Sequence, residues 1–376
     1  MRRVRICAFL FALFGAVAAA PRFAAAQDPA TPPPAPPPAA PAQPSAGASK
    51  ALNPDISVIG NFIGIAGKNP VESAASMELT EAEFAFQAAV DPYAKADFFL
   101  AVGPEGAELE EGFITFTTLP AGLLLKAGKM RAQFGKANTM HTHILPWADR
   151  PLVSRNLLGG EEGLADSGFS VSRLIPNNFI FLEAIGEVYK GESSVFQTDK
   201  RSRLMWLGRL RGYGDLTENA NLDIGLSFAH GPTDLGPDHD KKLYGIDATF
   251  RWRPLQRAIY RRFIARTELM WSRQDQPFGV VPVGTNEATR AFGFYGSADY
   301  QFARRWYVGG RVDRSGRALM PSLTDAGGMA HLTFWPTEFS QIRGQYRRVN
   351  YAEGVSANEV MLQLSFSIGA HGAHVF

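Results

Sequence analysis

Cysteine is nearly absent from this 376-residue sequence, and its single cysteine, Cys7, lies close to the start. Three of the first five residues are arginines, an apolar run follows to Ala20, and a short run of alanines ends at Ala26. This order of basic, apolar and small residues is typical of a secretory signal peptide, which we predict over residues 1–26. A mature chain starting after it has no thiol, which excludes disulfides, thiolate metal sites and cysteine nucleophiles.

The sequence also lacks an excess of positive charge once that signal is removed. Residues 1–26 contain four arginines and no acidic residue, so the formal net charge changes from +2 for the whole chain to −2 without them. The basic pI of about 8.6 therefore comes mostly from the export segment. Nucleic acid is accordingly not predicted as a partner.

Long apolar runs are missing as well. No stretch after residue 26 approaches the ~20 consecutive apolar residues that a membrane-spanning helix needs. Residues 27–50 are rich in proline and alanine and include two runs of three prolines, a composition that cannot bury a core. We therefore predict an extended, proline-rich periplasmic leader over 27–50, and any crossing of a membrane by the rest of the chain must use strands.

What the sequence does contain, over residues 51–376, is a repeat of segments in which apolar and polar residues alternate. In one of them Leu222, Ile224, Leu226 and Phe228 share one parity, and polar residues occupy the other. A period of two predicts a strand with one apolar face. The predicted strands are 55–66, 81–91, 94–103, 109–118, 123–134, 167–175, 179–190, 203–212, 221–230, 241–253, 262–273, 290–302, 306–314, 327–335, 339–349 and 358–368.

The connections between these segments are alternately short and long. Short periplasmic turns and long extracellular loops are typical of an outer-membrane barrel. We therefore predict an all-β fold, a closed antiparallel transmembrane β-barrel of about 16 strands. A soluble β-sandwich is the alternative, but its turns need not alternate in length and its sheet edges would need protection.

Charged residues lie on the faces opposite the apolar ones. Arg or Lys facing lipid at mid-membrane would cost ~2–4 kcal/mol each, so this face is predicted to be the lumen, which in barrels of this size generally holds water. Acidic residues such as Glu83 and Asp223 share this face. The alternative is that the charges pair across strands and stiffen the wall. The candidate pore-lining residues are Lys126, Arg209, Arg211, Arg251, Arg266, Arg311, Arg343 and Arg347.

The longest connection is predicted from Gly135 to Asp166, and connections of this length are usually functional or disordered. It contains a His-x-His pair, which could bind a metal together with nearby carboxylates, but the pair has no fixed spacing to a third ligand. We therefore predict hydrogen bonding within the loop or lining of the pore for these histidines, with no metal site and no cofactor. Its charged and imidazole residues are the candidate constriction residues, namely His141, His143, Asp149, Arg150, Arg155, Glu161, Glu162 and Asp166.

Motifs of catalysis are scarce. No Gly-x-Ser-x-Gly elbow, phosphate loop, paired zinc histidines or dinucleotide fingerprint is present, so we predict no enzyme. A barrel-embedded hydrolase stays open as an alternative, because His230, His239 and His331 are available as bases.

These features together resemble the Gram-negative outer-membrane porins. The resemblance rests on the signal peptide, the sixteen strands and the terminal Phe376, which ends a series of alternate residues that begins at Ile368. Residues 125–135, LKAGKMRAQFG, are similar to a strand of the phosphate-selective porin superfamily of the O and P type. Two features of that superfamily, an N-terminal coiled coil and a dense ladder of inward cations, are absent from this sequence.

The resemblance implies a location in the outer membrane, in contact with its lipid, and insertion through recognition of Phe376 by the barrel-insertion machinery. It also implies a homotrimer and passive diffusion of small hydrophilic solutes or ions. In such porins the third loop folds into the barrel, so opposed acids and bases on 135–166 would filter solutes by size and charge. Anion selectivity does not carry over. A substrate-selective or hydrophobic-solute transporter is the alternative within transport.

Overall fold

The computed structural model describes residues 54–235, 239–275 and 288–369. The predicted signal peptide and leader, and the predicted role of Phe376, lie outside these residues. Among the described residues, no helix has the length and apolar run that a membrane-spanning helix requires.

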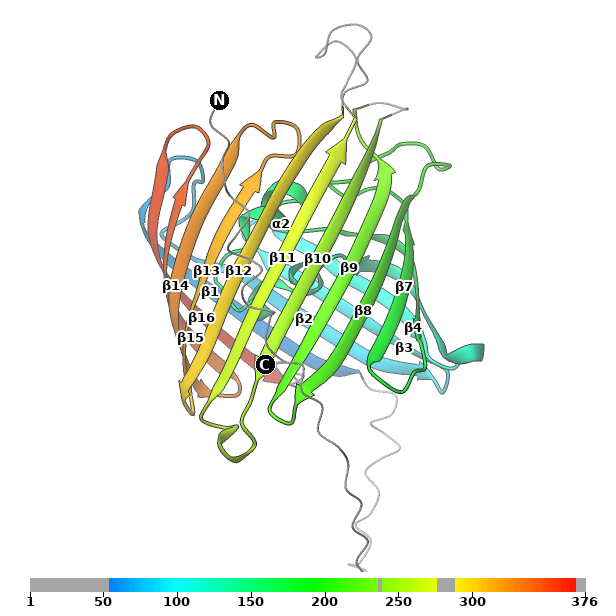
Figure 1. Cartoon of the computed structure of the whole chain (residues 1–376), viewed down its shortest axis with the longest axis horizontal. Coiled ribbons are helices and arrows are strands. Elements are labelled where there is room, and N and C mark those ends of the chain that lie inside the picture. Colours follow the sequence, from blue (N-terminus) through cyan, green and yellow to red (C-terminus); the bar gives the residue numbers. More distant parts are fainter. Residues whose placement is uncertain (1–53, 236–238, 276–287, 370–376) are drawn as a thin grey trace, which may run out of the picture. The chain divides into compact units, whose positions relative to one another are not determined.

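Sixteen strands form one closed antiparallel barrel, which confirms the predicted fold class (Figure 1). Every predicted segment overlaps one of them. The strands are β1 Asp55–Lys68, β2 Met77–Asp91, β3 Ala94–Gly103, β4 Gly106–Phe116, β5 Leu123–Arg131, β6 Ala165–Leu174, β7 Phe181–Tyr189, β8 Met205–Thr217, β9 Ala220–Pro232, β10 Asp240–Trp252, β11 Arg262–Gln274, β12 Thr289–Ala303, β13 Trp306–Gly316, β14 Thr324–Thr337, β15 Ser340–Asn350 and β16 Ser356–Gly369.

The barrel closes because the first and last strands pair with each other. The register of β1 and β16 runs from Ser57 opposite Gly369 to Lys68 opposite Asn358. Each strand therefore has a hydrogen-bonded neighbour on both sides. Closure leaves no strand edge unpaired, which is the condition for a sheet to sit in lipid.

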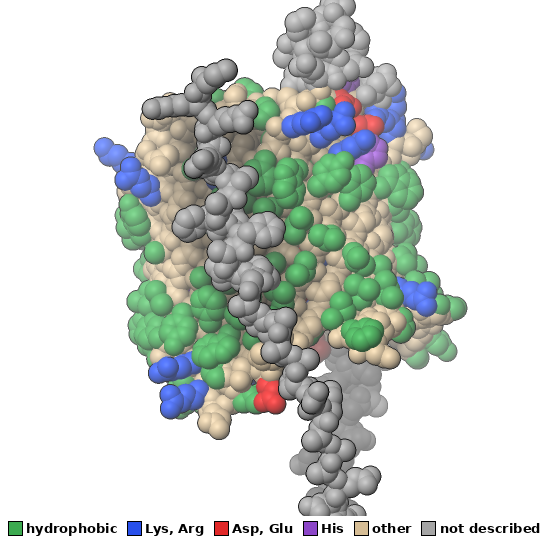
Figure 2. All heavy atoms as spheres, in the orientation of Figure 1, with side chains coloured by type: hydrophobic (Ala, Val, Ile, Leu, Met, Phe, Trp, Pro, Cys, Tyr) green, Lys and Arg blue, Asp and Glu red, His purple; other side chains and the backbone are tan. Residues whose placement is uncertain are grey.

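The exposed side chains of the strands are mostly apolar and the buried ones mostly polar, which is the reverse of a water-soluble sheet. In β9, Leu226 and Phe228 are 49% and 41% exposed, whereas Asp223 and Ser227 are only 2% and 6% exposed. On the side of the barrel that Figure 2 shows, hydrophobic side chains cover the middle, and charged side chains lie toward the two ends. The period-two pattern thus gives an apolar outer face and a polar inner one.

Only short helices interrupt the strands in the described residues. Within the described ranges the one α-helix is α2, Leu152–Leu157, and it packs against β11 to β14 (Figure 1). The 3-10 helices are η1 Pro120–Gly122, η2 Ala137–Thr139, η3 Thr142–Ile144 and η4 Leu255–Arg257.

Residues 132–164, called here the β5–β6 segment, form the longest connection between the described strands. Its limits differ from the prediction, because β5 ends at Arg131 and Asp166 belongs to β6. The Asp166 carboxylate accepts the backbone N–H groups of Gly191 and Glu192, at 2.8 and 2.9 Å, and this contact ties the start of β6 to the β7–β8 connection.

The largest buried apolar cluster forms around the β5–β6 segment. Phe134, Trp147 and Leu157 of the segment pack in one cluster with strand residues that include Tyr189 and Tyr295. The Trp147 and Tyr295 rings meet edge to face, with centroids 5.2 Å apart. Because the inner faces of the strands are mostly polar, the apolar side chains of the segment supply much of this core.

Candidate functional site

The beginning of the β5–β6 segment is fixed to β9 and β11 through its backbone. Gly135 N donates to Ser227 Oγ at 3.2 Å, and the N–H groups of Lys136 and Ala137 donate to Glu268 Oε1 at 2.8 and 2.6 Å. Gly135 has φ +65°, and a Cβ there would lie 2.5 Å from Glu268 Oε2. Only glycine therefore allows the chain to approach this carboxylate so closely.

The middle of the segment contacts β13 and β15 through Asp149. Its carboxylate accepts hydrogen bonds from Arg311 at 2.9 Å, from Gln345 at 2.6 Å and from Arg347 at 3.3 Å. Burial would raise the pKa of the Asp149 carboxyl, but the two arginines hold it below its usual value. Two predicted pore-lining cations and one predicted constriction residue thus form a single buried network.

Two further contacts extend this network. Arg343 donates to the carbonyl oxygen of Leu145 at 3.2 Å. The Arg311 guanidinium also lies over the Trp147 ring, 4.7 Å from its centroid, where the cation is attracted to the face of the indole. Arg311, Arg343 and Arg347 therefore hold the segment, and their charges are engaged with it.

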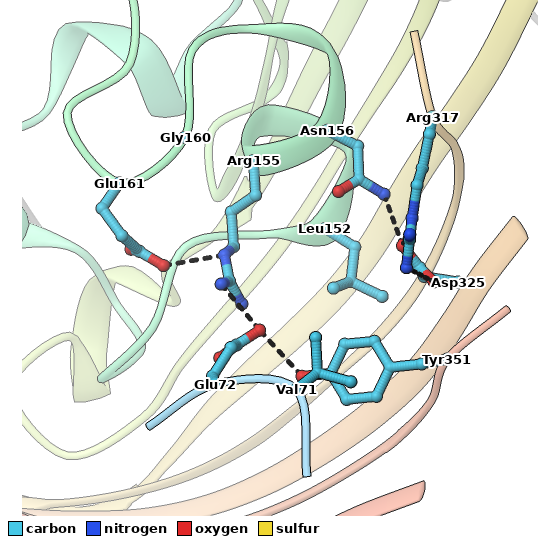
Figure 3. Close-up of a pocket in the computed structure, with 10 residues that line it drawn as sticks. All are labelled: Val71, Glu72, Leu152, Arg155, Asn156, Gly160, Glu161, Arg317, Asp325 and Tyr351. Atoms are coloured by element: carbon cyan, nitrogen blue, oxygen red, sulfur yellow. Dashed lines mark hydrogen bonds and ion pairs between the residues drawn. The ribbon is translucent and has the colours of Figure 1, made fainter. Parts of the chain in front are cut away.

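A cavity of about 310 Å³ lies beside α2 (Figure 3). Arg155 joins two carboxylates there, because its Nη2 lies 2.7 Å from Glu72 Oε1 and its Nε 2.7 Å from Glu161 Oε1. The Tyr351 hydroxyl donates to Glu72 at 2.7 Å. The cavity thus brings opposed charges of the segment and of the β1–β2 connection together without filling the space between them. Its lining consists of Val71, Glu72, Leu152, Arg155, Asn156, Gly160, Glu161, Arg317, Asp325 and Tyr351.

Three cations surround Asp223 on the inner face of β8 to β10. Arg211, Lys136 and Arg251 each place a nitrogen near Asp223 Oδ2, at 2.7, 3.9 and 3.9 Å. Their side chains are 30%, 29% and 24% exposed, whereas the Asp223 side chain is 3% exposed. Burial and the charge of Arg211 lower the pKa of the Lys136 ammonium. This basic group has more positive than negative charge and is partly open to water.

Other predicted pore-lining cations pair with carboxylates of the wall. Arg209 Nη1 lies 2.8 Å from Asp247 Oδ2, and Arg266 forms an ion pair with Asp299. Lys126 instead lies over an aromatic ring, with its Nζ 4.4 Å from the centroid of Phe113. These are the cross-strand contacts expected where charges stiffen the wall, so the inner face combines paired charges with the partly open basic group.

Two predicted constriction residues contact only the neighbourhood of their own segment. Arg150 donates to the carbonyl oxygens of Ala137 and Met140, at 3.3 and 3.1 Å. Burial lowers the pKa of its guanidinium to about 10. The backbone carbonyl oxygen of Glu162 accepts a hydrogen bond from the Arg131 guanidinium. Arg150 and Glu162 therefore shape the segment more than they contact the opposite wall.

His141 lies among three carboxylates of β2 and β4. Its Nδ1 is 2.6 Å from Glu83 Oε2 and 2.5 Å from Glu110 Oε2, and its Nε2 is 2.7 Å from Glu111 Oε2. Burial alone would lower the pKa of the imidazole, but the neighbouring carboxylates of Glu110, Glu111 and Glu83 raise it to about 11.

His143 joins the same group from the other side of Glu83. Its Nδ1 lies 3.3 Å from Glu81 Oε1 and 3.7 Å from Glu83 Oε2. We call Glu81, Glu83, Glu110, Glu111, His141 and His143 the histidine–glutamate cluster. The two histidines and Glu83 were predicted from the sequence as residues of the loop and of the inner face, whereas the other three acids were not. The available signal in the sequence was that Glu81 and Glu83 of β2 share one face of the strand. Their closeness to the acids of β4 depends on the register of the strands between them.

Comparison with known proteins reveals a similar fold. No protein-family model matches the sequence. The chain is 29% identical over 394 residues to an uncharacterised protein of Aquifex aeolicus, covering 89% of this chain and 82% of that protein. Similar solved structures include the outer membrane channel DcaP of Acinetobacter baumannii, with TM-score 0.57, 12% identity and coverage of 84% of this chain and 96% of that one. OprB of Pseudomonas putida matches with TM-score 0.57 and 11% identity, over 85% of this chain and 95% of that chain. An anion-selective porin from Comamonas acidovorans matches with TM-score 0.56 and 9% identity, over 84% of this chain and 100% of that chain.

Proposed function

We propose that this protein is an outer-membrane channel of the porin type, through which small hydrophilic solutes or ions diffuse passively. The observation that carries the proposal is the distribution of polarity: the sixteen-stranded barrel has an apolar outer face and a charged inner face. An apolar outer face suits lipid, and a barrel of this size can enclose an aqueous path. The similar folds of outer-membrane channels and porins support the same reading.

The β5–β6 segment is the proposed filter. It contacts β9 through Ser227, β11 through Glu268, and β13 and β15 through Asp149. His141 contacts β2 and β4. A segment attached at these points would fold into the barrel and narrow its bore. The fixed contacts would also hold that bore at a constant width while solutes pass.

The charges beside the segment have opposite signs on opposite sides of the proposed path. The basic group around Asp223 belongs to β8 to β10, and the acids of the histidine–glutamate cluster belong to β2 and β4. Such an arrangement produces a transverse field that acts on charged solutes. The partly exposed Arg211 and Arg251 are the residues that we expect to attract anions.

Conductance across a planar bilayer tests the proposal. The purified protein should give open-channel current, and in a salt gradient the double variant Arg211→Gln/Arg251→Gln should shift the reversal potential toward cation preference. Arg348→Gln is the matched control, because Arg348 lies on β15 with the exposed parity and should leave the potential unchanged. Absence of current from correctly folded protein would refute the channel.

A more selective channel is the second candidate. The apolar cluster that includes Trp147 and Phe134 would fill more of the interior than a thin, polar loop does. A small single-channel conductance, together with saturation by one class of solute, would favour this candidate over general diffusion.

Catalysis has less support from the geometry. His331 lies 2.8 Å from Asp299 and 3.1 Å from the Thr333 hydroxyl, but that hydroxyl is buried and also accepts from Arg343 at 3.1 Å. A nucleophile needs room for substrate, which this hydroxyl lacks. The absence of enzymatic activity stays a prediction, as do the homotrimer, the recognition of Phe376 by the insertion machinery and the narrower resemblance to the phosphate-selective porins.

A further inference from the structure

The histidine–glutamate cluster presents several ligand atoms to common points. The ligand atoms of Glu83, Glu110 and His141 all lie within 4.8 Å of one another, and so do those of Glu81, Glu83 and His143. Both groups share Glu83. Imidazole nitrogen and carboxylate oxygen are the ligands of many zinc sites, and a mixed set of this kind suits divalent transition metals.

The hydrogen atoms available cannot satisfy this arrangement. His141 Nδ1 carries at most one hydrogen, yet Glu110 Oε2 and Glu83 Oε2 approach it to 2.5 and 2.6 Å. That hydrogen serves Glu110, and Glu83 Oε2 is left as a buried oxygen without a hydrogen-bond donor. The Glu83 side chain is only 3% exposed, so water does not replace the missing donor freely. A buried carboxylate oxygen aimed at two imidazoles therefore calls for a further positive partner.

The charges of the cluster also favour a bound cation. Four carboxylates meet two arginines: Arg131 pairs with Glu110 at 2.9 Å, and the charge of Arg150 acts on Glu110 and Glu81. The carboxylates of this buried cluster therefore outnumber its arginines by two. A divalent cation would offset this excess of acids over arginines, and burying it uncompensated would be costly.

We propose that the histidine–glutamate cluster binds one divalent transition-metal ion such as Zn²⁺, with Glu83, Glu110 and His141 as its ligands and with Glu81 and His143 beside it. The ligands come from β2, from β4 and from the β5–β6 segment. The ion therefore fastens the segment to the wall at a point distinct from the contacts of Asp149 on β13 and β15. Binding of the ion does not depend on the proposed channel function.

Metal binding to the full-length, folded protein tests this inference. The protein is prepared without a histidine tag, treated with chelator, and titrated with Zn²⁺ in a calorimeter and with Co²⁺ in an absorption spectrometer. We expect one tightly bound ion per chain and a Co²⁺ spectrum with nitrogen and oxygen ligands. Because each lost ligand removes a direct bond to the ion, Glu83→Gln and His141→Gln should each weaken binding by about 100-fold or more, at or beyond the loss typical of outer-shell changes.

Two controls separate this site from incidental binding. His230→Gln removes an imidazole that is 36% exposed and lies away from the cluster, so binding should persist. His371→Gln/His374→Gln removes the histidines near the C-terminus and should likewise have no effect. Heat-modifiability in gel electrophoresis reports whether each variant barrel is folded, and Glu110→Gln, which removes the third proposed ligand, replaces any cluster variant that is not.

The expected pattern is loss of binding in the cluster variants alone. No stoichiometric binding to the folded wild-type protein would refute the site. Binding that survives Glu83→Gln and His141→Gln but disappears with His371→Gln/His374→Gln would refute it equally, because the ion would then belong to the C-terminal histidines. Open-channel current is measured in a separate experiment, so the site and the channel can fail separately.

Discussion

Asp149→Asn is expected to loosen the β5–β6 segment from β13 and β15. A hydrogen bond to a charged group contributes about 1.5–3 kcal/mol. The amide retains one acceptor oxygen, and Arg311 keeps its contact with Asp313 at 2.7 Å while Arg347 keeps Glu359 at 2.5 Å. The loss therefore corresponds to one or two such bonds, about 3 kcal/mol. At about 1.4 kcal/mol for each factor of ten, the open population of the segment should rise by about 100-fold.

Hydrogen exchange of the folded protein measures this opening directly. Amides of residues 145–158 should exchange about 100-fold faster in Asp149→Asn, because local opening limits their exchange, while strand amides stay protected. Asp215→Asn is the control, since Asp215 is exposed near the end of β8 and should change nothing in the segment. Equal protection of 145–158 in Asp149→Asn and wild type would refute the idea that Asp149 holds the segment.

Three other changes test different parts of the structure. Arg155, Tyr351 and Arg347 outweigh the effect of burial and lower the pKa of Glu72 below 4.5. The ionised Glu72 carboxylate therefore stabilises the folded state above that pH, and this stabilisation is lost as the pH falls through the lowered pKa. Glu72→Gln should abolish this loss of stability at acid pH, measured as thermal unfolding against pH. Leu226→Arg should destabilise the barrel in lipid vesicles by ~2–4 kcal/mol if β9 faces lipid there, and an unchanged urea midpoint would contradict that face. Gly128 has φ +141°, and a Cβ there would lie 2.2 Å from Gly112 O, so Gly128→Ala should reduce refolding yield; full yield would show that the backbone adapts.

The strands could be predicted because their signal is local. Alternation with a period of two reports which residues share a face, and each of the sixteen predicted segments overlaps a strand. The ends of the strands were predicted less accurately than their positions. The segment predicted over 123–134 stops at Arg131, because Phe134 N donates to Ala132 O and the chain turns away from the wall there.

The candidate site could be predicted only in part. Asp149 and Arg311 were both predicted as site residues, but the sequence gives no means of pairing residues 162 positions apart in the chain. Lys136 was not predicted as a member of the basic group, because that residue lies outside any strand and has no parity. Glu110 and Glu111 were not predicted either, because their nearness to Glu83 depends on the position of β3 between β2 and β4.

The register of β3 illustrates why tertiary structure is needed. Ala101 lies opposite Glu83, and Phe99 lies opposite Glu111. The register of β3 and β4 shifts between Phe99 and Leu100, where Glu110 has no opposite residue, and Glu110 and Glu111 both reach His141. A shift of register by one residue would place these acids on the outer face, and nothing in either strand alone fixes that register.

The sequence by itself determined the class of fold, the number of strands and the polarity of the two faces, because a period of two is a property of each segment. Tertiary structure alone decided which charges are neutralised and which stay partly open to water. A charge pair needs two groups within a few ångströms, and here that distance is set by strand register and by the path of residues 132–164. The same path brings His141 and His143 to the acids of β2 and β4.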